Sequence, residues 1–194
     1  MTIGEIRFVG DPHLGHQLVS GLRGFDSVED HDHQILANMA RVAQPDTIWW
    51  HTGDEAFNGW RGRIAAFAEI PGTHHLVLGN HDRAFPANSN SYKYVADYLE
   101  VFASVQLAAR ISYEGRRLLI CHFPYDGDTT GRGEERFEQW RLRDLGAMLI
   151  HGHTHSDQRI SHSTRGTVQL HAGLDAWGLV PPTIGDVLAE AELL

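Results

Sequence analysis

Residues 75–82 read His75-Leu76-Val77-Leu78-Gly79-Asn80-His81-Asp82. The apolar residues at the start of this stretch predict a short buried strand. The glycine that follows allows the backbone to turn where a Cβ would obstruct. The strand therefore ends in an amide, an imidazole and a carboxylate. Alone, such a stretch is typical of a polar loop, so its meaning depends on how the other strands of the chain end.

The first half of the chain alternates predicted strands with predicted helices. Strands are predicted over residues 5–10, 47–51 and 75–78, and helices after Ser27 and over residues 61–69. Ser27 and Asp30 form a capping-box pattern, a serine followed three residues on by a carboxylate. Strands and helices in this order predict an α/β unit, in which functional sites form at the carboxyl ends of the strands.

The second half has a different pattern. Strands are predicted over residues 104–112, 116–122, 148–150 and 167–170, and helices over residues 134–144 and after the capping box Thr183-x-x-Asp186. Glu114-Gly115 is a hairpin signal that joins the first two of these strands. Residues 126–133, rich in Gly, Asp, Thr and Arg, predict a surface loop.

Five strand ends carry oxygen or imidazole side chains. They are Asp11 with His13; Asp54; Asn80 with His81 and Asp82; His122; and His153 with His155. Residues two apart on an extended segment point the same way, so each spaced pair can reach one centre. These donors suit divalent Mn, Fe, Zn, Co or Ni. They are too many for one ion and enough for two ions that share a carboxylate.

A two-ion site of this kind suits hydrolysis at phosphorus. Two neighbouring ions lower the pKa of a bridging water and neutralise charge that builds on the phosphate oxygens in the transition state. A nearby protonated imidazole can then donate its proton to the leaving oxygen.

In their order and content, the five motifs resemble the signature of calcineurin-like metallophosphoesterases. They are Asp11-x-His13, Gly53-Asp54, Gly79-Asn80-His81-Asp82, His122 and Gly152-His153-Thr154-His155. Residues 168–178, with Asp175-Ala176-Trp177, also resemble the tail of small phage and bacterial members. The resemblance implies an α/β (α+β) fold, a four-layer αββα sandwich of two mixed β-sheets flanked by helices, in one domain over residues 1–194.

The resemblance also implies a role for each motif residue. One ion would be held by Asp11, His13, Asp54 and His155, and the other by Asp54, Asn80, His122 and His153, so that Asp54 bridges them. The nucleophile would be a hydroxide between the ions. His81 would face the leaving group, and Asp82 would orient His81 and raise its pKa. Manganese is the expected metal, with Fe, Zn, Co or Ni as alternatives.

Contacts with substrate are predicted at His16, Arg83 and Tyr125. A structural role is the alternative for His16, which follows the first motif. Arginine is considered because guanidinium matches phosphate geometry, and Arg23 and Arg132 are further candidates for the same reason.

Several other polar residues are interpreted as structural. The run Asp30-His31-Asp32-His33 is interpreted as a solvated helix start, because acids are expected at helix N-termini. His74 and His75 are expected on the surface where a strand begins. Glu55 is expected to lie outside the ligand set, because adjacent residues point apart.

Composition excludes several classes of protein. The chain has 194 residues, a formal net charge of −9 and one cysteine, Cys121. The negative charge argues against an extensive nucleic-acid surface, and a single cysteine excludes a disulfide framework. The sequence shows no signal core and no apolar run long enough to cross a bilayer, which predicts a cytoplasmic protein without a membrane partner. Nothing in the pattern requires a second copy of the chain.

The sequence therefore predicts a binuclear, metal-dependent phosphohydrolase that acts on a small phosphoester. The leading hypothesis is a phosphodiesterase for nucleotide-type substrates, cyclic nucleotides among them. The alternatives are a phosphomonoesterase of low selectivity, a nuclease for short single strands, and a non-catalytic scaffold of the same fold, such as a retromer subunit. The complete set of motif residues favours an enzyme.

Overall fold

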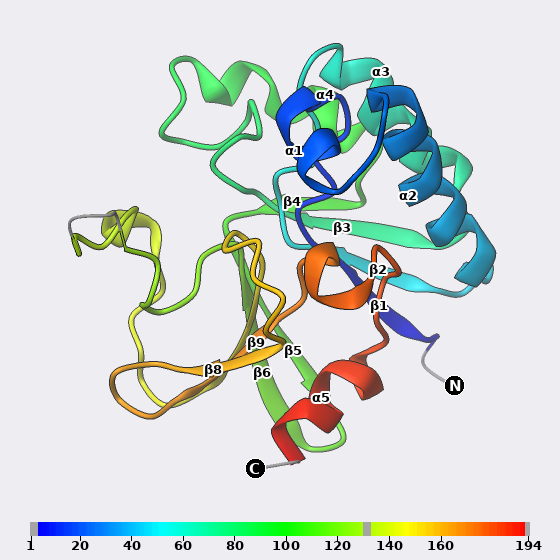
Figure 1. The fold of residues 1–194 in the computed structure, drawn as a ribbon. Helices are drawn as coiled ribbons and strands as arrows, with labels where there is room; N and C mark the ends of the chain where they lie inside the picture. Colours follow the sequence, from blue (N-terminus) through cyan, green and yellow to red (C-terminus); the bar gives the residue numbers. More distant parts are fainter. Residues whose placement is uncertain (1–3, 130–132, 193–194) are drawn as a thin grey trace.

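Two β-sheets form the centre of the computed structural model, which describes residues 4–129 and 133–192 (Figure 1). The first sheet contains β1 (Ile6–Val9), β2 (Ile48–His51), β3 (Thr73–Val77) and β4 (Ser104–Gln106) in that order. The second sheet has the order β5 (Ala108–Tyr113), β6 (Arg116–Cys121), β7 (Met148–His151), β9 (Val168–His171) and β8 (Ile160–His162).

The two sheets differ in strand direction. All pairings of the first sheet are parallel. In the second sheet β7 is parallel to both of its neighbours, whereas the outer strands β5 and β8 are antiparallel. The predicted sandwich of two sheets is therefore confirmed, with one correction: only the second sheet is mixed.

Most of the helices lie on one side of the paired sheets. They are α1 (Gln17–Leu22), α2 (Val28–Val42), α3 (Trp60–Ala65), α4 (Val95–Leu99) and α5 (Ile184–Glu192). Helices α1 to α4 gather over the first sheet, and α5 lies at the opposite end, near both chain ends (Figure 1). The serine of the first predicted capping box caps α2, since Ser27 Oγ accepts the Asp30 N–H at 3.0 Å.

Alternation along the strands divides the core into two clusters. On β1, Phe8 belongs to the cluster that also holds Ile120 of β6 and Val187 of α5, whereas Val9 belongs to the cluster that holds Ile35 of α2. Successive side chains of a strand point to opposite faces. One cluster therefore fills the space between the sheets, and the other lies beneath the helices.

Two predicted elements are wrong. The strand predicted over residues 104–112 is interrupted at Leu107, and its halves, β4 and β5, belong to different sheets. The helix predicted over residues 134–144 is reduced to a 3-10 turn, Glu138–Trp140. Phe137 has a left-handed backbone (φ 56°), which an α-helix cannot accommodate.

Three elements had no clear sequence signal: α1, α4 and β8. The predicted surface loop at residues 126–133 is described only in part, because residues 130–132 lie outside the described residues. Within the described ranges, no helix combines the length and apolar character that crossing a bilayer requires.

Candidate metal centre

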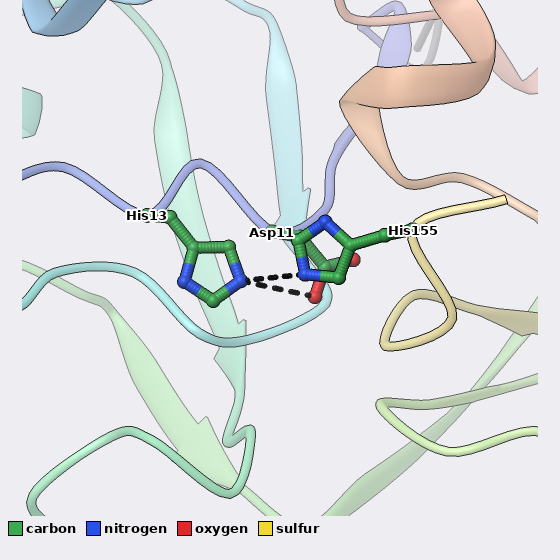
Figure 2. A group of neighbouring side chains, drawn as sticks. All are labelled: Asp11, His13 and His155. Carbon is green, nitrogen blue, oxygen red and sulfur yellow. Dashed lines mark hydrogen bonds and ion pairs between the residues drawn. The ribbon is translucent and has the colours of Figure 1, made fainter. Parts of the chain in front are cut away.

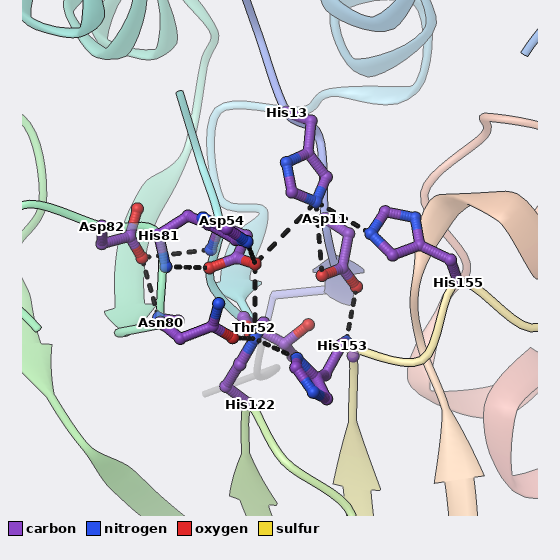
Figure 3. Close-up of polar contacts among 12 residues, drawn as sticks. Asp11, His13, Thr52, Asp54, Asn80, His81, Asp82, His122, His153 and His155 are labelled. Carbon is purple, nitrogen blue, oxygen red and sulfur yellow. Dashed lines mark hydrogen bonds and ion pairs between the residues drawn. The ribbon is translucent and has the colours of Figure 1, made fainter. Parts of the chain in front are cut away.

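The predicted ligands meet where strands of both sheets end. Asp11 and His13 follow β1, Asp54 follows β2, Asn80 follows β3, His122 follows β6, and His153 and His155 follow β7. Six of these residues form two groups, each with its ligand atoms within 4.8 Å of one another. Cluster one is Asp11, His13 and His155 (Figure 2), and cluster two is Asp54, His122 and His153 (Figure 3).

Five ligand candidates have a left-handed backbone. Their φ angles are 53° at Asp11, 49° at His13, 60° at Asp54, 71° at His153 and 49° at His155. Positive φ is uncommon outside glycine and is strained, and its concentration in one place marks a functional site. The paired ligands therefore converge through turns rather than through strand alternation, which corrects the geometric reasoning from the sequence.

Glycines allow two carboxylates to approach the main chain of other motifs. A Cβ on Gly79 would lie 2.2 Å from Asp54 Oδ1, and a Cβ on Gly152 would lie 2.5 Å from Asp11 Oδ2. Both distances are far inside van der Waals contact. The glycines that precede Asn80 and His153 therefore make room for the acidic ligands.

In cluster one, ring nitrogens and carboxylate oxygens converge on one another. His13 Nε2 lies 2.9 Å from His155 Nε2, 3.9 Å from Asp11 Oδ1 and 3.8 Å from Asp54 Oδ2. His155 Nδ1 donates to an Asp175 oxygen at 2.9 Å, so Nε2 of the neutral ring has a lone pair. Asp11 Oδ1 is buried and has no hydrogen-bond partner among the described residues.

Cluster two has the same property. His122 Nδ1 donates to the Thr52 carbonyl at 2.7 Å, and His153 Nε2 donates to Asp128 at 2.8 Å. The inner nitrogens, His122 Nε2 and His153 Nδ1, lie 3.1 Å apart. Asp54 Oδ2 lies 3.5 Å and Asn80 Oδ1 lies 3.1 Å from His122 Nε2.

Acceptors that face acceptors need a cation between them. The donors are imidazole nitrogen and carboxylate or amide oxygen, which suit first-row divalent metals. Asp54 Oδ2 is near both clusters, as a bridging ligand would be. Burial, together with the charges of Asp11 and Asp82, raises the pKa of Asp54 well above its usual range, and a cation would offset that effect. The residues therefore fit two divalent ions.

Asp82 does not orient His81, contrary to the prediction. Asp82 Oδ2 accepts the N–H groups of Gly79 at 2.8 Å and Asp54 at 3.1 Å, and Oδ1 accepts that of Glu55 at 3.0 Å. No hydrogen bond joins Asp82 to the His81 ring in the part of the chain that the structure describes. The buried carboxylate instead fixes the main chain around Asp54 (Figure 3).

His81 lies at the mouth of the centre. Its N–H donates to Asp54 Oδ1 at 2.8 Å, and its ring Nε2 is 4.0 Å from Asp54 Oδ2. Burial, together with the neighbouring imidazoles of His122, His16 and His155, lowers the pKa of His81 to about 4. The expected rise in the pKa of His81 is therefore wrong for the protein without ions or substrate.

The predicted substrate contacts have different outcomes. The Tyr125 hydroxyl donates a hydrogen bond to the Ala147 carbonyl at 2.8 Å, and the side chain is buried. The prediction that Tyr125 contacts substrate is therefore wrong. Arg83 is exposed and lines a cavity of about 350 Å³ together with Asn80 and His81. His16 is a structural cap, since its Nδ1 accepts the Val19 N–H at 3.3 Å, yet its ring is also 5.5 Å from that of His13.

Sequence reasoning missed the polar residues that surround the ligands. His31 and Asp32 are buried rather than solvated, because Asp32 accepts the Gly15 N–H at 3.0 Å and binds Arg63. Arg23 binds Asp175 rather than substrate, and Arg132 lies outside the described residues. His74, expected on the surface, is buried. Asp175 lies in the tail segment that resembles small phage and bacterial members, so the sequence drew attention to it. No sequence motif included Asp128.

A family comparison covers the part of the chain that carries these residues. Residues 5–176 match the model of the calcineurin-like phosphoesterase superfamily domain. The chain belongs to the calcineurin-like phosphoesterase superfamily. Among curated relatives, this superfamily member is 40% identical over 182 residues to the Gene 66 protein of Mycobacterium phage L5, covering 88% of this chain and 86% of that protein. It is 38% identical over 189 residues to the Gene 66 protein of Mycobacterium phage D29, covering 92% of each.

A solved structure shows the same fold. The crystal structure of a protein of unknown function, AQ665 from Aquifex aeolicus, superposes with a TM-score of 0.69 at 21% identity, covering 98% of this superfamily member and all (100%) of that chain. The family and the two ligand clusters together indicate a protein that binds divalent metal ions.

Proposed function

We propose that the protein is a phosphodiesterase that uses two divalent metal ions and acts on small nucleotide-type diesters, including cyclic nucleotides. The observation that supports this proposal most strongly is the pair of clusters in which ring nitrogens and carboxylate oxygens lie within 4.8 Å of one another, with Asp54 Oδ2 near both. Manganese is the proposed metal for both positions.

The roles of the residues follow from their positions. When bound, two ions would supply positive charge for the phosphate oxygens and acidify a water molecule. Asp54 would hold both halves together, and Asp82 would keep the Asp54 main chain in place. His81, exposed at the mouth, would donate its Nε2 proton to the leaving oxygen. Phosphate bound beside the ring favours the protonated imidazole, which opposes the lowered pKa of His81.

The cavity beside His81 supports a diester substrate. It has a volume of about 350 Å³, within the usual range of ligand pockets. Its lining combines apolar rings, amides and a guanidinium, from Ala56, Phe57, Asn58, Gly59, Trp60, Asn80, His81, Arg83 and Asn88. Such a wall could accept one organic group of a diester while phosphorus lies at the ions.

A phosphomonoesterase is the second candidate, and Arg83 favours it. The Arg83 side chain is exposed beside the centre, where a guanidinium would match the doubly charged phosphate of a monoester.

The test is a direct comparison of substrates. Protein stripped with a chelator and reloaded with Mn²⁺ is assayed on bis-p-nitrophenyl phosphate and on p-nitrophenyl phosphate, with Asp54→Asn as the inactive control. Faster cleavage of the diester supports the phosphodiesterase and leads to cyclic nucleotides as the next substrates. Faster cleavage of the monoester supports the second candidate. If the protein bound two ions and cleaved neither substrate, both candidate functions would be contradicted and a non-catalytic scaffold would be favoured.

A further inference from the structure

The outer nitrogens of two ligand histidines are held by side-chain carboxylates. His155 Nδ1 donates to Asp175 Oδ2 at 2.9 Å, and His153 Nε2 donates to Asp128 Oδ2 at 2.8 Å. The corresponding nitrogen of His122 donates to a main-chain carbonyl, that of Thr52. One histidine in each cluster is thus oriented by a carboxylate that a substitution can remove.

An arginine holds the carboxylate of cluster one. Arg23 forms two parallel hydrogen bonds to Asp175, Nε to Oδ1 and Nη2 to Oδ2, both at 2.8 Å. Arg23 Nη2 also donates to the Asp11 carbonyl at 2.8 Å, and Nη1 donates to the Pro12 carbonyl at 3.2 Å. The Arg23 side chain is only 5% exposed. One guanidinium therefore connects the support of His155 to the main chain of the first motif.

A separate arginine pair holds the carboxylate of cluster two. Arg136 Nε lies 3.1 Å from both oxygens of Asp128. Arg141 Nη2 donates to the Asp128 carbonyl at 3.0 Å. Among the described residues, none is shared with the support of cluster one, which comes from Arg23, directly after α1, and from the turn after β9.

We infer that Asp175 and Asp128 are positioning residues that set ion binding in cluster one and cluster two separately. The inference rests on the proposed two-ion site, not on its substrate. A carboxylate at the outer nitrogen keeps the hydrogen there, which leaves the lone pair on the inner nitrogen and makes that nitrogen more basic. Removal of such a carboxylate typically lowers metal affinity 10-fold to 100-fold.

The test measures ion binding rather than activity. Metal-free protein is titrated with Mn²⁺ in a calorimeter, and two binding events are expected. Asp175→Ala should weaken one event by about 10-fold or more, and Asp128→Ala should weaken the other by a similar factor. Asn in place of either Asp should restore only part of the affinity, because its Oδ1 can accept the histidine hydrogen bond while its NH2 group faces an arginine donor.

Double variants identify which event belongs to which cluster. In a His155→Ala background, which disables cluster one, Asp175→Ala should have no further effect, whereas Asp128→Ala should still weaken binding. A His122→Ala background should reverse this pattern. Asp97→Ala is the matched control, because Asp97 forms a similar two-bond pair with Arg61 at 3.0–3.2 Å and has no hydrogen bond to a ligand histidine among the described residues.

Circular dichroism and thermal unfolding test whether each variant folds. Where an Ala variant does not fold, the corresponding Asn variant replaces it. The inference would be overturned if Asp175→Ala or Asp128→Ala weakened both Mn²⁺-binding events equally. It would also be overturned if neither variant weakened any binding event. Either result would leave the two-ion site intact. Fewer than two ions in the wild-type protein would overturn the proposed function as well.

Discussion

Two regions of the molecule pack imidazoles against carboxylates, and they differ in where the hydrogens lie. In the metal centre, outer nitrogens donate to Thr52, Asp128 and Asp175, so that lone pairs face one another inside. The second region, which we name the histidine chain, consists of Glu55, His51, His74 and the Ile70 carbonyl. Its side chains are buried, and each of its hydrogen bonds has a donor and an acceptor.

The order of hydrogens in the histidine chain follows from its end. The Ile70 carbonyl only accepts, so His74 Nε2 donates to it at 3.0 Å, and His74 Nδ1 accepts from His51 Nε2 at 2.9 Å. His51 Nδ1 must then accept from Glu55 Oε2 at 2.8 Å. Burial agrees with this neutral arrangement, because it lowers the pKa of His51 and His74 to about 3 and raises that of Glu55 well above its usual range.

The comparison shows that a count of neighbouring histidines does not identify a metal site. What identifies it is that outer ring nitrogens are held by acceptors, so that the inner nitrogens of His122, His153 and His155 face the other ligand candidates. The adjacent residues Asp54 and Glu55 belong to different regions by this criterion, although both are buried carboxyl groups.

Substitution of these two neighbours should give the largest contrast. Asp54→Asn should lower activity by roughly a thousandfold, since several kcal/mol of transition-state stabilisation depend on the ions, and both ions should bind more weakly in calorimetry. Glu55→Gln should retain activity within a few-fold, because the amide can donate to His51 as the protonated carboxyl does. Two tightly bound ions in Asp54→Asn would contradict the bridging role.

Substitution of His81 separates chemistry from ion binding. His81→Asn should bind both ions normally and lose about 100-fold in turnover. The loss should be larger for esters with poor leaving groups, which need a proton most, and can be measured with a series of substituted phenyl esters. The same loss for every leaving group would argue against proton donation by His81.

The histidine chain should affect stability rather than ions. His51→Leu leaves the Glu55 carboxyl and His74 Nδ1 without partners, which should lower the free energy of unfolding by about 1–3 kcal/mol in denaturant titrations. The exposed His33→Leu is the control and should change it by less than about 0.5 kcal/mol. Weakened Mn²⁺ binding in a folded His51→Leu protein would show that the two regions are not separate.

The pH dependence of stability gives the smallest effect. Below about pH 6.5 the unfolded chain protonates His74, whereas the folded chain does so only near pH 3. The unfolded state binds more protons in this window, so stability should be highest above it and decrease as the pH falls through it. Between pH 6.5 and 5.5, the free energy of unfolding should decrease by about 1 kcal/mol less in His74→Gln than in the wild-type protein. If denaturant titrations showed the same pH dependence of the free energy of unfolding in His74→Gln and the wild-type protein, His74 would not be neutral in the folded chain.

The parts of this molecule that the sequence predicted are local in origin. Strands that end in polar residues, the serine that caps α2 and the order of five motifs depend on neighbours along the chain. They placed Asp11, Asp54 and His122 in one centre before any contact was known.

The parts that could not be predicted depend on contacts distant in sequence. Asp82 binds the main chain of a loop 27 residues away, and Arg23 meets Asp175 across 152 residues. The helix predicted over residues 134–144 fails where Arg136 and Arg141 turn to Asp128. Local propensity contains no information about such partners.

The left-handed backbone of the five ligand candidates has a consequence for how the protein tolerates change. At about 1 kcal/mol for each residue, this conformation stores roughly 5 kcal/mol, which is comparable with the entire net stability of a small domain. Glycine at any of these positions would relieve the stress and remove a ligand at once. Selection for a more stable fold and selection for the metal centre therefore oppose each other at the same five positions. A lineage that no longer needed the centre would gain stability by losing these ligand residues.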